Sequence, residues 1–239
     1  MTLPRVRAPN RVDAYDRAMT WSGTLACVGG GAFVANDHLD RSLLGEVGAS
    51  RVVVLPTADA FEQPGTLIAA AMSWAERLDV DIEALMVMAR ADAEDPGAAA
   101  VVAGARAVYL AGESSMHLRS VLKSTAVLGA IAGVLAGGGL VAAIGPCATA
   151  MCDPMLDQRG GAFTLGLGLA SGLAVVTGIE NWSAERLHRA RQLANTPFVE
   201  LPTGSAVINR AGTWSSVGDA AIHGELPSVT APLTTPGTG

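Results

Sequence analysis

Short apolar runs of about the length of a β-strand recur along the chain, separated by longer polar and helical segments. These five runs are Thr24–Val28, Arg51–Thr57, Asp81–Val87, Arg106–Ala111 and Leu140–Ile144. Continuous apolar runs are typical of strands that are buried on both faces, as in a parallel sheet. The pattern therefore predicts a buried central sheet.

A helical pattern lies between two of these runs. In the segment Pro64–Leu78 the apolar residues Leu67, Ala71, Trp74 and Leu78 follow one another at helical spacing. Such a stripe is what a helix needs to cover a sheet. The alternation of strands and helices predicts an α/β fold with a mostly parallel central sheet.

The pattern changes after Cys147. The segment Leu165–Thr177 is extended and interrupted by glycine, and Ser183–Ala194 is predicted to be a helix with Ser183 as its N-cap. Short strands then run to Ile222, so we expect this half to be more antiparallel. The expected organisation is an N-terminal arm (residues 1–22), a single domain (23–224) and a disordered tail (225–239), which is rich in Pro, Ser, Thr and Gly.

One uncharged segment, Ser124–Cys152, is long enough to suggest a membrane span. However, Gly137–Gly139 should end a helix, Leu140–Ile144 reads as a buried strand, and Gly145-Pro146 reads as a turn. We therefore interpret it as part of an α/β domain and expect no membrane association. The first twenty residues lack the apolar core of a signal peptide.

Composition narrows the function classes. Of 239 residues, 50% are hydrophobic and only 16% are charged, which excludes disorder for most of the chain. A net charge of −6 argues against a nucleic-acid partner. Three cysteines cannot form a disulfide framework, which favours a reducing compartment and a cytoplasmic location.

Cofactor signals are weak. The turn Gly29–Gly31 follows the first strand, but neither the dinucleotide fingerprint nor a P-loop occurs, so we interpret it as a tight structural turn. The four histidines are scattered singly with no metal-ligand spacing. We expect neither a metal nor a cofactor.

The segment Ile144–Ala150 carries the clearest chemical signal. A buried strand runs into a turn and then a helix, with Cys147 at the turn and the small residue Gly145 two positions before it. This is the layout of a nucleophile elbow, in which the turn exposes the nucleophile and the helix N-terminus favours the thiolate. A buried structural cysteine after a core strand is the alternative interpretation.

The wider chain, from about Thr24 to Ile222, resembles the cyanophycinase and dipeptidase E group of serine peptidases (peptidase family S51). The matching segments are Gly29–Ala32, Val54–Ala58, Tyr109–Gly112, the elbow, Asp153–Met155 and Gly166–Leu169. The resemblance implies a three-layer α/β sandwich of the class I glutamine amidotransferase-like type.

The resemblance also implies site residues, several of which depart from the family pattern. Cys147 stands at the position of the nucleophilic serine, and Thr149 replaces the second elbow glycine. The catalytic histidine falls on Gly178, and the later acidic segment falls on Leu201–Ala206, with Thr203 in it. Gly112, Glu113 and Ala148 take the positions of the turn and the backbone donors that form the oxyanion hole. The triad is thus degenerate.

Two other histidines could supply the missing base, and a third is expected to have no such role. His117 is the best placed, although we expect it on the helix that follows Gly112. His223 belongs to a His-x-Glu pattern used by cysteine amidotransferases of the same fold, but it is expected in a terminal hairpin away from the site. His188 is expected at the edge of the buried face of a helix, with no catalytic role.

Three hypotheses follow. The first is a catalytically degenerate protein that uses the scaffold for binding or assembly. The second is a cysteine-dependent peptidase or amidase with a relocated base, and the third is a thiol-reactive or redox-responsive protein. A triad that lacks one member loses several orders of magnitude in rate, which favours the first. The partners considered are a small peptide or amide, a second copy or another protein.

Overall fold

The computed structural model describes residues 21–227. Most of the expected N-terminal arm and tail therefore lies outside the described residues. Within them, the largest sheet has the strand order β13-β12-β1-β5-β4-β2-β3. Its parallel strands are β1 (Thr24–Val28), β2 (Arg51–Leu55), β3 (Asp81–Ala84), β4 (Ala107–Leu110) and β5 (Leu140–Ile144). The strands β12 (Ala206–Arg210) and β13 (Thr213–Val217) extend it in antiparallel fashion.

The five predicted central strands are confirmed, two of them at both bounds. The prediction for the third was too long, because β3 ends at Ala84 rather than at Val87. The amide of Leu85 still donates to the Val54 carbonyl, but the Val87 amide donates to Leu85, so the chain turns away from the sheet. The burial of Val87 therefore comes from packing beneath helices.

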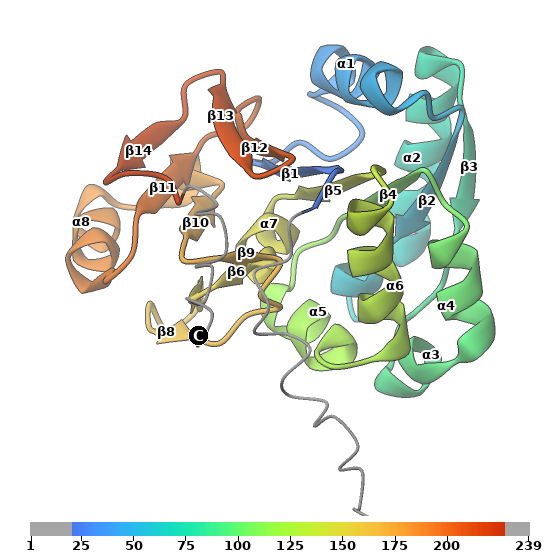
Figure 1. The fold of residues 1–239 in the computed structure, drawn as a ribbon. Coiled ribbons are helices and arrows are strands. Elements are labelled where there is room, and N and C mark those ends of the chain that lie inside the picture. The colour runs from blue at the N-terminus through green and yellow to red at the C-terminus, as the bar shows by residue number, and fades with distance from the viewer. Residues whose placement is uncertain (1–20, 228–239) are drawn as a thin grey trace, which may run out of the picture.

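Helices cover both faces of this sheet (Figure 1). Two helices, α1 (Asp37–Val47) and α2 (Pro64–Leu78), pack on one face, where α2 has its predicted bounds. The other face is covered by α3 (Arg90–Glu94), α4 (Pro96–Ala103), α5 (Ser115–Leu122) and α6 (Ala126–Ala136). Successive side chains of a strand point to opposite faces of the sheet. Each buried strand therefore contributes side chains to the hydrophobic core on either face. The predicted α/β sandwich is confirmed.

The core between α1, α2 and the sheet is built around aromatic rings. Phe33, Trp74 and Tyr109 are each at most 1% exposed, and the Trp74 and Tyr109 rings lie 5.2 Å apart. The carboxylate of Asp40 accepts hydrogen bonds from Trp74 Nε1 (2.9 Å) and from the Tyr109 hydroxyl (3.1 Å). This polar group is thus satisfied inside the apolar layer, as a buried carboxyl must be.

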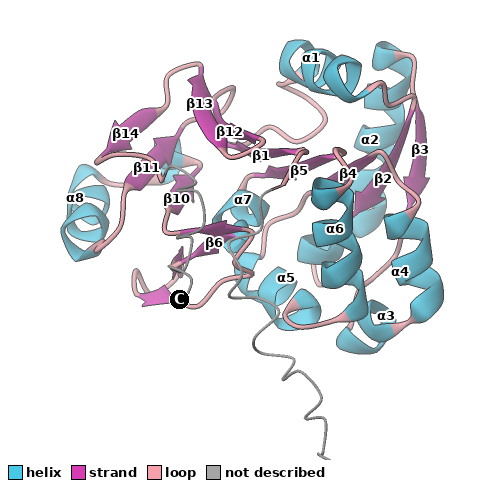
Figure 2. Cartoon of the chain, in the orientation of Figure 1, coloured by secondary structure: helices cyan, strands magenta, loops and turns pink. Residues whose placement is uncertain are grey.

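The C-terminal part forms a smaller layer beside the main sheet (Figure 2). Its sheet contains β10 (Ala174–Thr177), β11 (Phe198–Leu201) and β14 (Ala221–His223), with β11 and β14 antiparallel. Two short ribbons precede it, β6 (Cys152–Asp153) with β9 (Ala170–Ser171), and β7 (Met155–Leu156) with β8 (Phe163–Thr164). The expected antiparallel tendency is therefore confirmed in part, since β10 and β11 run parallel.

The helix α8 (Ala184–Leu193) packs on the smaller sheet. The Ser183 side chain accepts from the Arg186 amide, which confirms the predicted N-cap. His188 is exposed, so its expected place at the edge of the buried face is wrong. The apolar face of this short helix is confined to residues such as Ala190 and Leu187.

The uncharged segment behaves as interpreted. The helix α6 ends before Gly137, and β5 follows it as a fully buried strand. Along residues 21–227 no single helix has the length and apolar character to cross a membrane, and α5 and α6 reach that length only as a pair bent by 97°.

Candidate functional site

The candidate site lies where the parallel strands end. The turn Gly29–Gly31 follows β1, the 3₁₀ helix η1 (Thr57–Asp59) follows β2, Gly112 and Glu113 follow β4, and α7 (Pro146–Met151) follows β5. Because parallel strands share one carboxyl edge, these four connections gather at that edge. The predicted site residues from β4 and β5 are thus brought together with η1.

The elbow turn forms as the sequence predicts. Gly145 has φ 60° and ψ −134°, a conformation that favours glycine, and its amide donates to the Val28 carbonyl. The next residue, Pro146, is the first of α7, where the missing amide costs nothing. Cys147 therefore lies in the first turn of a six-residue helix directly after a buried strand.

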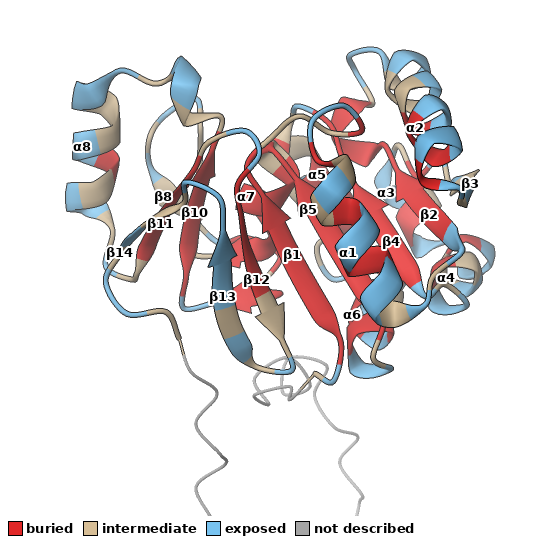
Figure 3. Ribbon diagram, turned by 90° about the horizontal axis from the view of Figure 1, so that it is seen from above, coloured by how far each residue is buried: buried red, intermediate tan, exposed pale blue. Residues whose placement is uncertain are grey.

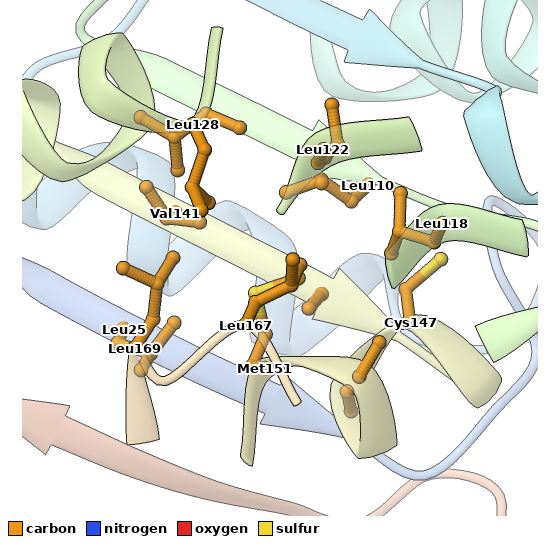
Figure 4. Packing of buried hydrophobic residues seen from close by; sticks show 14 of the residues in the cluster. Leu25, Leu110, Leu118, Leu122, Leu128, Val141, Cys147, Met151, Leu167 and Leu169 are labelled. Carbon is orange, nitrogen blue, oxygen red and sulfur yellow. The ribbon is translucent and has the colours of Figure 1, made fainter. Parts of the chain in front are cut away.

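The expected exposure of Cys147 is wrong, and its surroundings do not favour the thiolate. Its side chain is 0% exposed, and the sulfur points toward Leu118 among the core side chains of Figure 4. Burial, followed by the charges of Asp59 and Glu113, raises the pKa of the Cys147 thiol well above its usual value. The helix N-terminus does not overcome this burial, so the group is a neutral thiol.

The polar surroundings of the sulfur are sparse. Its hydrogen-bond partner within the described residues is the Gly112 carbonyl, at 3.9 Å from the sulfur. A backbone carbonyl can accept a hydrogen bond from the thiol, but it cannot act as a base that removes the thiol proton. Cys147 thus fits the structural alternative that the sequence left open.

Asp59 accepts a hydrogen bond from one of the two backbone amides that the sequence predicts as oxyanion donors. Its Oδ1 accepts a hydrogen bond of 2.8 Å from the Glu113 amide, which is one of the expected oxyanion donors. The other expected donor, the Ala148 amide, donates to the Gly145 carbonyl at 2.9 Å. Gly112, with φ 127°, allows this close approach, because a Cβ there would lie 2.6 Å from the Asp59 amide nitrogen.

The mouth of the site is acidic. Burial, together with the charges of Asp59 and Glu62, raises the pKa of Glu113. Asp59 is 8% exposed, whereas Glu62 and Glu113 are exposed. A negative charge developing on a substrate oxygen would be destabilised beside these carboxylates.

His117 lies on α5, as expected, and its ring contacts Met88 and Phe61. The Nε2 atom lies 3.0 Å from the Met88 carbonyl oxygen, and the ring packs edge-on against Phe61 with centroids 4.7 Å apart. A carbonyl oxygen only accepts, so Nε2 carries a proton and is the donor in this hydrogen bond. The contacts orient His117 toward the α3 side of the helix layer.

His223 belongs to the smaller sheet. It lies at the end of β14, where its Nε2 is 3.3 Å from Glu200 Oε1, and Glu200 also forms an ion pair of 2.6 Å with Arg191. The sequence placed it in a terminal hairpin, and the structure pairs β14 with β11. It contributes to this charged cluster.

The two positions on which the sequence comparison places the missing triad members border the glycine turn. Gly178 has φ 62°, and its amide donates to the Gly29 carbonyl at 3.1 Å. Thr203 is exposed, its amide donates to Glu180, and its side chain lies against Gly30. Neither position carries an imidazole or a carboxylate.

A glutamine that the sequence analysis missed fills the space behind the elbow. Gln158 Nε2 donates to the hydroxyls of Thr149 (3.4 Å) and Thr177 (3.3 Å). Thr149 replaces the second elbow glycine, and Thr177 directly precedes Gly178. This bridge ties α7 to β10 with neutral groups. Asp59 was also missed, although it follows the matched segment Val54–Ala58 by one residue.

The site offers little for a cofactor. Gly29 packs against the chain near Pro202, since a Cβ there would lie 2.0 Å from the Pro202 carbonyl oxygen, so the turn serves close packing. Among residues 21–227 no group of three His, Cys, Asp or Glu side chains is arranged to hold a metal ion.

The architecture defines the class of protein as an α/β sandwich with an elbow at the carboxyl edge of its sheet. The sequence matches no protein-family model and no curated protein. Among solved structures, a peptidase from an acI-B1 Actinobacterium superimposes with a TM-score of 0.76 at 23% identity, over 85% of this chain and 91% of that one. A candidate peptidase E protein from Listeria monocytogenes EGD-e superimposes with a TM-score of 0.62 at 15% identity, over 82% and 98%. The chain thus has a peptidase E-like fold.

Proposed function

We propose that this chain is a catalytically degenerate protein with a peptidase E-like fold, which uses the scaffold for binding or assembly instead of hydrolysis. The observation that carries the proposal is the hydrogen bond of 2.8 Å from the Glu113 amide to Asp59. An oxyanion hole works only if its donors are free to receive the oxygen that becomes negative. Here a carboxylate of the chain itself holds that donor.

The nucleophile position supports the same conclusion. The attacking species must be a thiolate within reach of a substrate, and the Cys147 thiol is neutral and fully buried. Its sulfur contacts a carbonyl rather than an imidazole. Hydrolysis would require changes at the nucleophile, the base and the oxyanion hole together.

The two alternatives lack such support. A cysteine-dependent hydrolase needs a base within about 3.2 Å of the sulfur, and the His117 ring is held by Met88 and Phe61. A thiol-reactive protein needs an accessible sulfur, and Cys27, Cys147 and Cys152 are all fully buried.

The test is an assay of the full chain with β-aspartyl-arginine and Asp-X dipeptides, the substrates that the resemblance implies. We expect turnover of the wild type to equal that of Cys147→Ala, because no group generates the thiolate. Circular dichroism of each variant checks that it is folded. Turnover that is lost in both Cys147→Ala and His117→Ala would overturn the proposal and would identify His117 as the base.

A further inference from the structure

The strand β3 forms one edge of the main sheet and leaves backbone groups open. Figure 3 shows it at the margin of the buried strands, and within residues 21–227 it pairs with β2. The amides of Asp81 and Leu85 donate to carbonyls on the β2 side. Alternate residues of a parallel strand face the same neighbour, so the backbone groups of Ile82 and Ala84 face outward. Open edges of this kind accept an extended segment as an additional strand.

A groove of about 360 Å³ lies beside this edge, between the C-terminal end of α2 and the start of β3. Its volume falls in the range of about 300 to 1,000 Å³ that is usual for ligand pockets. The apolar part of its lining includes Met72, Val80 and Ile82. Met72 is 56% exposed, and the other two are half-buried. The described chain therefore leaves apolar surface uncovered beside an open strand edge.

The same groove is acidic. Its lining includes three exposed carboxylates, Glu76, Asp79 and Asp81. None of the three forms an ion pair with another residue of the described chain. Glu83, by contrast, is paired with Arg51 at 2.8 Å and is not available to a ligand. The groove also lies at the C-terminal end of α2, where the helix dipole favours a cation.

We propose that the edge of β3 and this groove bind an extended segment of another protein, in which a basic residue and an apolar residue are two positions apart. The backbone of the segment pairs with Ile82 and Ala84. Residues two positions apart lie on the same face of a strand. The apolar side chain therefore covers the groove beside Ile82, and the basic side chain reaches the three carboxylates at its end.

This surface is separate from the elbow. The groove lies at the amino-terminal end of β3, whereas the elbow follows the carboxyl end of β5, three strand positions away in the sheet order. The proposal therefore does not depend on whether the elbow is catalytic.

A second copy of this chain is a poorer occupant of the edge. The strand itself reads Asp81-Ile82-Glu83-Ala84, with two acidic residues and no basic one. Pairing two such strands would add negative charge next to an acidic groove, and like charges on neighbouring strands destabilise a sheet. The acidic edge thus favours a basic segment from a different protein.

Binding of a synthetic peptide to the full chain tests the proposal. The probe is acetyl-Arg-Thr-Val-Thr-Arg-amide, whose residue order is the same in both directions, so that it suits parallel and antiparallel pairing alike. Amide hydrogen exchange of Ile82 and Ala84 is measured by NMR with and without the peptide. At a peptide concentration about nine times its dissociation constant, exchange of both amides should slow about tenfold, because only the unoccupied fraction exchanges. The amides of Asp81 and Leu85, which already donate within the sheet, should not change.

Charge variants test the basic specificity. Asp79→Asn with Asp81→Asn should weaken peptide binding about fivefold, which corresponds to roughly 1 kcal/mol for two exposed charge contacts. Asparagine tolerates the left-handed backbone of Asp79, where φ is 57°. The matched control is Asp219→Asn with Glu225→Gln, which removes two exposed charges on either side of β14 and should leave the affinity unchanged. The peptide acetyl-Glu-Thr-Val-Thr-Glu-amide should not slow exchange.

Three results would overturn the proposal. The first is exchange of Ile82 and Ala84 that stays unchanged at any concentration of the basic peptide, because the edge would then not accept a strand. The second is equal weakening by the groove variant and by its control, which would show attraction to the net charge alone. The third is protection of both amides that increases with protein concentration in the free chain, which would assign the edge to a second copy.

Discussion

At the scale of single residues, Asp59 links the Glu113 amide to the electrostatics of the elbow cysteine. Its carboxylate accepts the Glu113 amide and also raises the pKa of the Cys147 thiol, after burial, which is the larger cause. The cysteine at the elbow therefore lies in an environment that favours its protonated form.

A charge change at Asp59 tests this relation. Asp59→Asn keeps an oxygen acceptor for the Glu113 amide and removes the negative charge, so the pKa of Cys147 should fall. We expect alkylation of Cys147 by iodoacetamide to accelerate by up to about tenfold at fixed pH, since one pKa unit changes the thiolate fraction tenfold. Peptide mapping by mass spectrometry measures the rate for each cysteine.

The matched control for that experiment is Glu62→Gln. It removes the same charge close by, but Glu62 acts on Glu113 and not on the Cys147 thiol. Equal acceleration in the two variants would mean that the reaction follows local opening of the site rather than the charge of Asp59. The wild type should react far more slowly than the unfolded chain because all three sulfurs are buried.

At the scale of elements, two glycines illustrate opposite uses of the same residue. Gly145 holds the turn between β5 and α7 with a positive φ, although a Cβ there would meet nothing within 4 Å. Gly129 lies on the exposed face of α6 with ordinary helical angles, and a Cβ there would also meet nothing within 4 Å. The space is the same, so the backbone conformation alone should decide the effect of alanine.

The paired variants make this a measurement. Gly145→Ala should lower the free energy of unfolding by about 1–3 kcal/mol through backbone strain. Gly129→Ala should raise it by about 0.5–1 kcal/mol, because alanine is the better helix former. Urea unfolding followed by circular dichroism gives both values. A neutral result at Gly145 would show that the elbow relaxes to a different turn.

At the scale of the whole molecule, the buried carboxyl of Asp40 couples stability to pH. Burial, opposed by hydrogen bonds from Trp74 and Tyr109, raises its pKa to about 6. The folded state then holds a proton that the unfolded state releases at a lower pH. This group stabilises the fold fully below its unfolded pKa, and the contribution is lost as the pH rises through about 6.

Comparison with Asp40→Asn isolates that contribution. Between about pH 6.5 and pH 4 the wild type should gain up to about 3 kcal/mol in free energy of unfolding relative to the variant. The difference is the useful quantity, because Asp37 and Glu46, whose pKa values are lowered, give the opposite slope in both proteins. Parallel pH profiles for the two proteins would contradict the raised pKa of Asp40.

The sequence by itself determined the five parallel strands of the main sheet and the helix α2. The strands β1 and β5 and the helix α2 have the bounds that apolar spacing predicts. This agreement is expected because the spacing of apolar residues along the chain distinguishes a buried strand from an amphipathic helix. The elbow turn was also predictable, since Gly145 and Pro146 restrict the backbone at neighbouring positions.

Only the tertiary structure decided the state of Cys147. A local pattern predicts that the thiol lies at a helix N-terminus, but its burial depends on α5, and its pKa depends on Asp59 after β2 and Glu113 after β4. The same holds for His117, whose proton is fixed by a carbonyl 29 residues earlier in the chain, at Met88. Desolvation and charge act through space, so residues distant in sequence determine whether a group at the elbow can react.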